Sequence, residues 1–119
     1  MELQVVAQEI SKKIKLLEEG RNILAVKAHN KANTIAEYDK AFAITIIKLN
    51  NGVEFDIDGN KVQNPKTSIM EKIAKGLCWK ERLDMELADA EYKNAISSLD
   101  CLKTELNGYQ SINRHLSEI

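Results

Sequence analysis

Aromatic rings, helix breakers and cysteines are all scarce in this chain of 119 residues. Aromatic residues make up 5% of the sequence, which contains one proline, five glycines and two cysteines. Strand-rich folds need many turns and many β-branched or aromatic residues, so this composition disfavours them and favours long aliphatic helices. The length suits a single domain, 1–119.

The two cysteines are too far apart to form a disulfide. Cys78 and Cys101 fall in one expected helix, where the rise per residue would separate them by about 34 Å. The Cα atoms of a disulfide lie no more than about 7 Å apart. We therefore expect two reduced thiols with packing roles.

Neither sign of charge dominates, and no long hydrophobic run occurs. The chain has 17 basic and 18 acidic residues, for a net charge of -1. Direct nucleic-acid binding is disfavoured because it draws on clustered basic surface. The longest nearly apolar run, residues 41–47, is far shorter than the roughly 20 residues of a membrane span. Glu2 also stands where a signal peptide carries basic residues, so we expect a cytoplasmic protein without membrane contact.

A heptad pattern dominates the first part of the sequence and predicts a helix over about 3–49. Apolar residues alternate at spacings of three and four, with breaks at Arg21 and Lys31. Such a stripe must lie against another surface. The stripe consists of Leu3, Ala7, Ile10, Ile14, Leu17, Leu24, Ala28, Ile35, Tyr38, Phe42, Ile46 and Leu49.

A connector of about 50–67 follows, in which the apolar period changes from 3.5 to two. Residues 50–52 are Asn-Asn-Gly, which end helices because they tolerate the left-handed conformation. The alternation around Phe55 and Ile57, followed by Asp58 and Gly59, predicts a β-hairpin. An irregular connector that tucks Phe55 beneath the helix ends is the alternative.

The second half predicts a short helix and then a second long one. Ser68 and Glu71 form a capping-box pattern that would open a helix at about 68–75, with Gly76 as an elbow. A long helix over about 77–117 follows, in which we expect Gly108 to permit close helix approach. Its apolar stripe is Met85, Ala88, Tyr92, Ala95, Leu99, Leu102, Leu106, Tyr109, Ile112 and Leu116.

Two long amphipathic helices joined by a short connector predict an all-α fold, a long antiparallel helical hairpin resembling a coiled coil. A short β-hairpin or loop would lie at its tip. If the numbers of facing residues add up to about 126, Leu17 faces Tyr109 and Arg21 lies level with Glu105. This register sets apolar residues against apolar residues and one charge against its opposite.

A hairpin has only one internal interface, yet both helices carry further apolar residues outside the predicted stripes. Left in water, these would form patches larger than monomers usually expose. We therefore expect a homodimer, with docking of the same face on a foreign protein as the competing use. The residues are Val5, Val6, Leu16, Ile23, Val26, Ile44 and Ile47 in the first helix, and Leu83, Leu87 and Ile96 in the second.

No motif with known chemistry occurs. The sequence contains no phosphate-binding glycine loop, zinc-ligand pair or nucleophile elbow. A calcium loop starting at Asp56 fails, because Lys61 and Thr67 occupy the positions that need glycine and glutamate. His29 and His115 are expected too far apart to cooperate. We expect no cofactor, no metal and no enzymatic activity.

Four residues at the start of the second long helix are candidates for partner binding. Trp79 is one, since tryptophan is enriched at interface hot spots. Glu81, Asp84 and Glu91 fall near one helix face, which could present carboxylates as a DNA-mimicking surface does. The alternatives are a tryptophan that plugs the end of the core and an ordinary solvated acidic face.

The segment Ser68-Ile-Met-Glu-Lys-Ile-Ala-Lys-Gly76, with Leu106-Asn-Gly-Tyr-Gln-Ser-Ile-Asn-Arg-His-Leu116, resembles small helical-hairpin proteins of unassigned function encoded in phages and prophages of Gram-positive bacteria. The resemblance covers mainly residues 68–116. It implies a helix-connector-helix fold and a viral context in the bacterial host, and it brings no catalytic residues.

Together these features predict a non-enzymatic phage protein that acts by binding other proteins. Small helical phage proteins often disable a host enzyme, so the specific expectation is an inhibitor of a host nucleic-acid-processing defence complex, as anti-CRISPR proteins are. Its partner would be a host protein or ribonucleoprotein complex. The alternatives are an accessory to phage recombination or single-stranded DNA handling, and a purely structural coiled coil.

Overall fold

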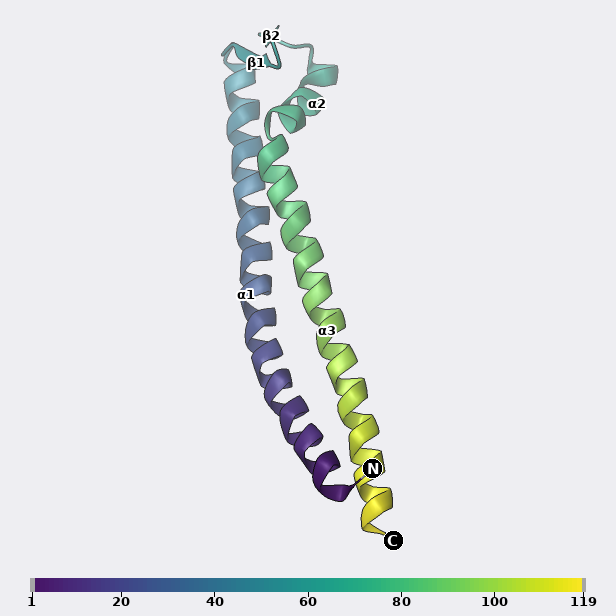
Figure 1. Cartoon of the computed structure of the whole chain (residues 1–119). Helices are drawn as coiled ribbons and strands as arrows, with labels where there is room; N and C mark the ends of the chain where they lie inside the picture. The colour runs from purple at the N-terminus through teal and green to yellow at the C-terminus, as the bar shows by residue number, and fades with distance from the viewer. Residues whose placement is uncertain (1, 119) are drawn as a thin grey trace. The chain divides into compact units, whose positions relative to one another are not determined.

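The computed structural model describes residues 2–118 and is dominated by two long helices. The elements in chain order are α1 (Leu3–Asn50), β1 (Phe55–Ile57), β2 (Asn60–Val62), α2 (Thr67–Leu77) and α3 (Trp79–Ser117), labelled in Figure 1. The predicted fold class, an all-α helical hairpin with a small β-hairpin and a short helix between the long ones, is confirmed. No helix in this part of the chain combines the length and the apolar character of a membrane span.

The chain divides into two compact units. One comprises Met1–His29 and Ala90–Ile119, in which residues 3–29 of α1 pack antiparallel to residues 90–117 of α3. The other is Asn30–Asp89, which contains the rest of α1, the β-hairpin, α2 and the first turns of α3.

Helix α1 ends in a Schellman motif centred on Gly52. The Gly52 amide donates to the Leu49 carbonyl at 3.2 Å, and the Val53 amide donates to the Lys48 carbonyl at 3.0 Å. Gly52 has a φ of 79°, a conformation that glycine adopts without steric cost. The predicted helix stop at residues 50–52 follows directly from this chemistry.

The predicted β-hairpin is present and pairs Phe55 with Val62 and Ile57 with Asn60. Asp58 and Gly59 form its turn with φ angles of 48° and 86°, as expected of a two-residue turn of type I′. The Asp56 carboxylate accepts a hydrogen bond from the Gly59 amide at 2.7 Å. Its oxygen therefore stabilises the turn.

Two predictions about α2 are wrong. The helix begins at Thr67 after an N-cap at Lys66, with no side-chain cap, so Ser68 already lies in the first turn and the expected capping box does not form. The elbow expected at Gly76 lies instead at Cys78, because α2 continues to Leu77. The Cys78 amide donates to Ala74 and its carbonyl accepts from Arg82, both at 3.0 Å. Cys78 therefore makes helical backbone hydrogen bonds both to α2 and to α3, although the helix axis breaks there.

The register in the first unit differs from the prediction by about one heptad. Lys13 pairs with Glu105 at 2.6 Å and Lys27 pairs with Glu91 at 2.9 Å, and in both pairs the residue numbers add up to 118. The expected sum was about 126, so the predicted pairing of Arg21 with Glu105 is wrong. A shift of seven or eight residues keeps the same stripes facing each other, since a heptad pattern repeats every seven residues.

Close packing of the helices supports this observed register. A Cβ atom added to Gly20 would lie 2.7 Å from Cδ2 of Leu99, so glycine is what allows Leu99 to approach the α1 backbone. Gly108 has no such neighbour within 4 Å, so the expectation that it permits close approach is wrong. Helix α3 does continue through Gly108.

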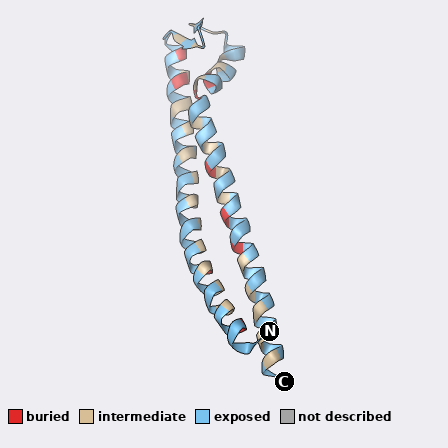
Figure 2. Ribbon diagram, viewed as in Figure 1, coloured by how far each residue is buried: buried red, intermediate tan, exposed pale blue. Residues whose placement is uncertain are grey.

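The buried core is thin in both units, as the scattered buried segments of Figure 2 show. Val6, Leu17, Ala95 and Leu99 are buried in the first unit. In the second, Leu49 and Ala74 are buried together with Cys78, whose sulfur lies 3.4 Å from the Thr45 hydroxyl oxygen. Most stripe residues are buried or half-buried, but five of them, including Ile14 and Ile35, remain exposed. Each helix thus buries only a narrow line of side chains.

The second apolar face predicted for the long helices is largely exposed. Val6 is the exception, since it is fully buried, and Leu16 is half-buried. The exposed members are Val5, Ile23, Val26, Ile44, Ile47, Leu83, Leu87 and Ile96.

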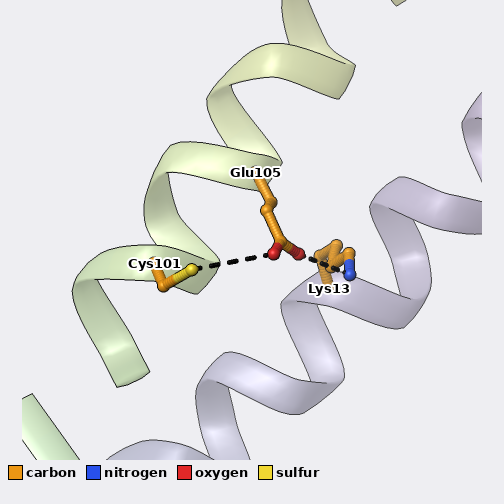
Figure 3. A network of polar contacts seen from close by, with 3 residues as sticks. All are labelled: Lys13, Cys101 and Glu105. Atoms are coloured by element: carbon orange, nitrogen blue, oxygen red, sulfur yellow. Dashed lines mark hydrogen bonds and ion pairs between the residues drawn. The ribbon is translucent and has the colours of Figure 1, made fainter. Parts of the chain in front are cut away.

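Lys13, Glu105 and Cys101 form a small polar network between α1 and α3 (Figure 3). The Lys13 side chain is only 17% exposed. Its hydrogen bond and its positive charge hold the pKa of Glu105 below the ordinary value of 4.5, and the carboxylate in turn raises the pKa of Lys13. The Cys101 thiol donates to the same carboxylate at 3.8 Å.

Substitution of the two helical glycines tests the register. Alanine is favoured over glycine in helices by about 1 kcal/mol, so Gly108→Ala should raise the free energy of unfolding by about that amount. Gly20→Ala should raise the free energy of unfolding by less than this or should lower it, because the Leu99 side chain has to move to make room for the new methyl group. Leu99→Ala removes the side chain that the new methyl group would meet. In that background, Gly20→Ala should raise the free energy of unfolding by about 1 kcal/mol. Equal gains from both glycines in the parent chain, measured by denaturant unfolding, would rule out this contact.

Acidification tests the Lys13–Glu105 pair. Because the folded chain lowers the pKa of Glu105, the pair contributes stability above the unfolded pKa of about 4.5, and this contribution is lost as the pH falls through the folded value. In Glu105→Gln, the melting temperature should therefore decline less steeply below pH 4.5 than in the parent. Glu18→Gln, at an exposed site with no recorded ion pair among residues 2–118, should keep the parent slope.

Candidate interaction surface

Trp79 occupies an exposed position where α2, α3 and the β-hairpin meet. It is the first residue of α3, directly after the break at Cys78, and 57% of its surface is accessible. A tryptophan that plugged the end of the core would be buried, so this alternative is wrong. The buried residue at the break is Cys78.

Two open hollows adjoin Trp79 and share Gly76 as a lining residue. The larger, of about 620 Å³, is lined by Lys72 and Lys75 from α2 and by Arg82, Leu83 and Glu86 from α3. The smaller, of about 410 Å³, is lined by Asp56, Ile57 and Asp58 of the β-hairpin, and by Leu77. Trp79 therefore has two neighbouring hollows, one chiefly apolar with three cations and Glu86 in its lining, and one with two aspartates.

The cations near Trp79 differ in how they are held. The Lys80 ammonium lies 5.5 Å from the centroid of the Trp79 ring, a favourable cation–π distance. Lys75 pairs with Glu71 one turn earlier in α2 at 3.5 Å. Lys72 and Arg82 have no ion pair recorded within residues 2–118, so both are available to a ligand.

The structure brings together three of the four candidate partner-binding residues. Trp79, Glu81 and Asp84 lie in the first two turns of α3, where Glu81 is half-buried and Asp84 is exposed. Glu91 belongs to the other unit, where it bridges to Lys27. The three predicted carboxylates therefore do not form one acidic face, because Glu91 belongs to the other unit and pairs with Lys27 of α1.

Several residues of this surface were not singled out from the sequence. Lys72, Lys75, Arg82 and Glu86 meet only because α2 turns at Cys78. For Arg82 and Glu86 a signal does exist, because both lie beside the apolar Leu83, on the same side of the helical wheel of α3. For the α2 lysines the sequence offers no such signal.

A second exposed group lies on α1. Ile44 and Ile47 are exposed in the second unit, with 59% of the Ile47 surface accessible. In the first unit, Ile23 and Val26 are similarly exposed. Side chains of this size are the usual anchors of protein interfaces when they gather on one face.

Groups capable of chemistry are dispersed. Residues 2–118 contain no cluster of three or more histidine, cysteine, aspartate or glutamate side chains that could hold a metal ion. His29 and His115 are both exposed. The cysteines are free, but the expected packing role holds only for Cys78, since Cys101 is exposed.

Comparison of the chain with protein family models, with curated protein sequences and with solved structures found no match.

Removal of the Trp79 ring should leave the fold intact. Trp79→Ala should change the free energy of unfolding by no more than about 0.5 kcal/mol, because surface substitutions rarely cost more. Leu49→Ala, at a site with 1% exposure, should cost about 2 to 5 kcal/mol. Acrylamide should quench Trp79 fluorescence readily in the native monomer, at concentrations below those at which the chain self-associates. A large stability loss in Trp79→Ala would contradict the exposed placement.

Proposed function

We propose that this chain is a non-enzymatic protein–protein interaction module. The observation that carries the proposal is the row of large aliphatic side chains left exposed on both long helices. Each is costly to keep in water, at roughly 25 cal/mol per Å² of apolar area, and each gains when another protein covers it. A surface of this kind supports function by binding.

The more specific proposal is an inhibitor of a host nucleic-acid-processing defence complex, encoded by a phage and acting in the cytoplasm of its bacterial host. The resemblance of residues 68–116 to phage-encoded helical hairpins supports the viral context. The balanced charge of the chain supports a protein partner over a polyanion. On this proposal the chain contacts a host protein or ribonucleoprotein complex through protein surface.

We also propose that the chain forms a homodimer. Two thin hairpins that share their exposed apolar faces would bury area that neither can bury alone. Both long helices offer such a face, so one can serve the second copy while the other binds the target. The α1 residues Ile23, Val26, Ile44 and Ile47 are the candidates for target binding.

Affinity capture with matched variants tests the proposed function. The parent chain, immobilised and exposed to host lysate, should retain one large host complex and inhibit it at a stoichiometry near one to one. Ile44→Asp combined with Ile47→Asp should lose that complex, while Lys40→Asp with Lys48→Asp should keep it. A metal chelator should not change the inhibition.

Two results would contradict this function. If one molecule disables many targets, the chain is an enzyme. If it retains single-stranded DNA with a steep salt dependence instead of a host complex, the recombination accessory is correct.

A further inference from the structure

The first turns of α3 carry a compact apolar face that no described part of the chain covers. Trp79, Leu83 and Leu87 follow one another at intervals of four residues, which places them on one side of a helix. Their exposed fractions are 57%, 49% and 54%. We call these three residues the α3 face.

Charges border the α3 face in a regular order. At about 100° per residue, Lys80 and Asp84 lie about 60° and 100° to one side of Leu83. Glu86 and Arg82 lie at about the same angles on the other side. All four are exposed. Each border thus carries one cation followed four residues later by one carboxylate.

This order is complementary to itself under a two-fold rotation. In an antiparallel pair of α3 helices centred on Leu83, the numbers of residues at the same level add up to 166, so Trp79 meets Leu87 of the second copy. The rotation places each border next to the same border of the second copy, with the two running in opposite directions. Lys80 then approaches Asp84 of the second copy, and Arg82 approaches Glu86 of the second copy.

We propose that a second copy of this chain docks antiparallel on the α3 face, with Leu83 on the two-fold axis. An interface of this kind uses the same patch on both subunits. The proposal rests on the proposed self-association and assigns it to particular residues. The exposed aliphatic residues of α1 then remain free for a foreign target.

The larger hollow beside Trp79 leaves room on one side of the α3 face. It is lined by Trp79, Leu83, Arg82 and Glu86, and Gly76 contributes no side chain to fill it. Because the rotation keeps each border on its own side, Glu86 of the second copy approaches Arg82 at this hollow. The same contact occurs twice in the dimer.

Other occupants fit the borders less well. A parallel two-fold pairing of α3 helices would set each border against the opposite border of the second copy, so that Lys80 lies near Arg82 and Asp84 lies near Glu86. A nucleic acid would meet Asp84 and Glu86 next to the cations it needs, which weakens its attraction. Only the antiparallel second copy matches every charge with its opposite.

The α3 face spans eight residue steps, or about 12 Å, which is short for a stable interface. We therefore expect a dimer that forms at micromolar concentration, with Trp79 as the main anchor. Trp79 is the only tryptophan, so burial of its ring should shift the emission of the chain to shorter wavelength as the concentration rises.

A charge-swap experiment on the full chain tests the proposal. One variant, Lys80→Glu with Arg82→Glu, makes all four border positions acidic. The other, Asp84→Lys with Glu86→Lys, makes all four basic. Each alone should self-associate at least about tenfold more weakly than the parent, because like charges face each other. An equimolar mixture should restore a dimer, observed as twice the 13.4 kDa mass by light scattering or sedimentation.

A matched control separates this effect from net charge. Lys12→Glu with Lys15→Glu changes the net charge by the same amount at exposed positions of α1, and it should dimerise like the parent. Far-ultraviolet circular dichroism should show the same helix content in all variants, and Leu83→Asp should also weaken dimerisation if a charge variant unfolds.

The possible failures are distinguishable. A parent chain that stays monomeric at about 100 μM overturns this inference and the homodimer, but not target binding by α1, since that concentration is well above a micromolar dissociation constant. A parent dimer that persists in the charge variants, or a mixture that does not recover, overturns the α3 face alone.

Discussion

Two antiparallel helices share one interface, and this constraint governs most of what the structure shows. Each helix can bury a single stripe, so Leu17 of α1 and Leu99 of α3 lie inside while large aliphatic residues such as Ile47 and Leu87 remain in water. In a bundle with more helices, these outer residues would be core. Here they form an exposed apolar surface that another protein can cover.

The elements were predictable because local chemistry determines them. The heptad period defines the long helices, Gly52 provides the left-handed residue of a Schellman motif, and Asp58 with Gly59 forms the tight turn. The start of α2 was less predictable. The capping-box pattern at Ser68 predicted a later start than the observed one, and the backbone carbonyl of Lys66 accepts the first hydrogen bonds instead.

The register was not predictable from the heptads, because a shift of seven residues leaves every apolar position facing an apolar position. What distinguishes the registers lies outside the stripes. Gly20 admits Leu99 at close range, and Lys13 meets Glu105. The division of the candidate site follows from the same register, since Glu91 pairs with Lys27. Trp79 could be singled out by residue type, whereas its hollows depend on the turn at Cys78.

The ion pairs recorded between the long helices have a consistent polarity. In Lys13–Glu105, Lys27–Glu91 and Lys31–Asp89, the lysine belongs to α1 and the carboxylate to α3. Two α1 helices that met through their inner stripes would oppose lysine to lysine, and two α3 helices would oppose carboxylate to carboxylate. The inner stripes therefore select heterotypic pairing, α1 with α3. These charges favour an approach of like helices from different molecules through their outer sides.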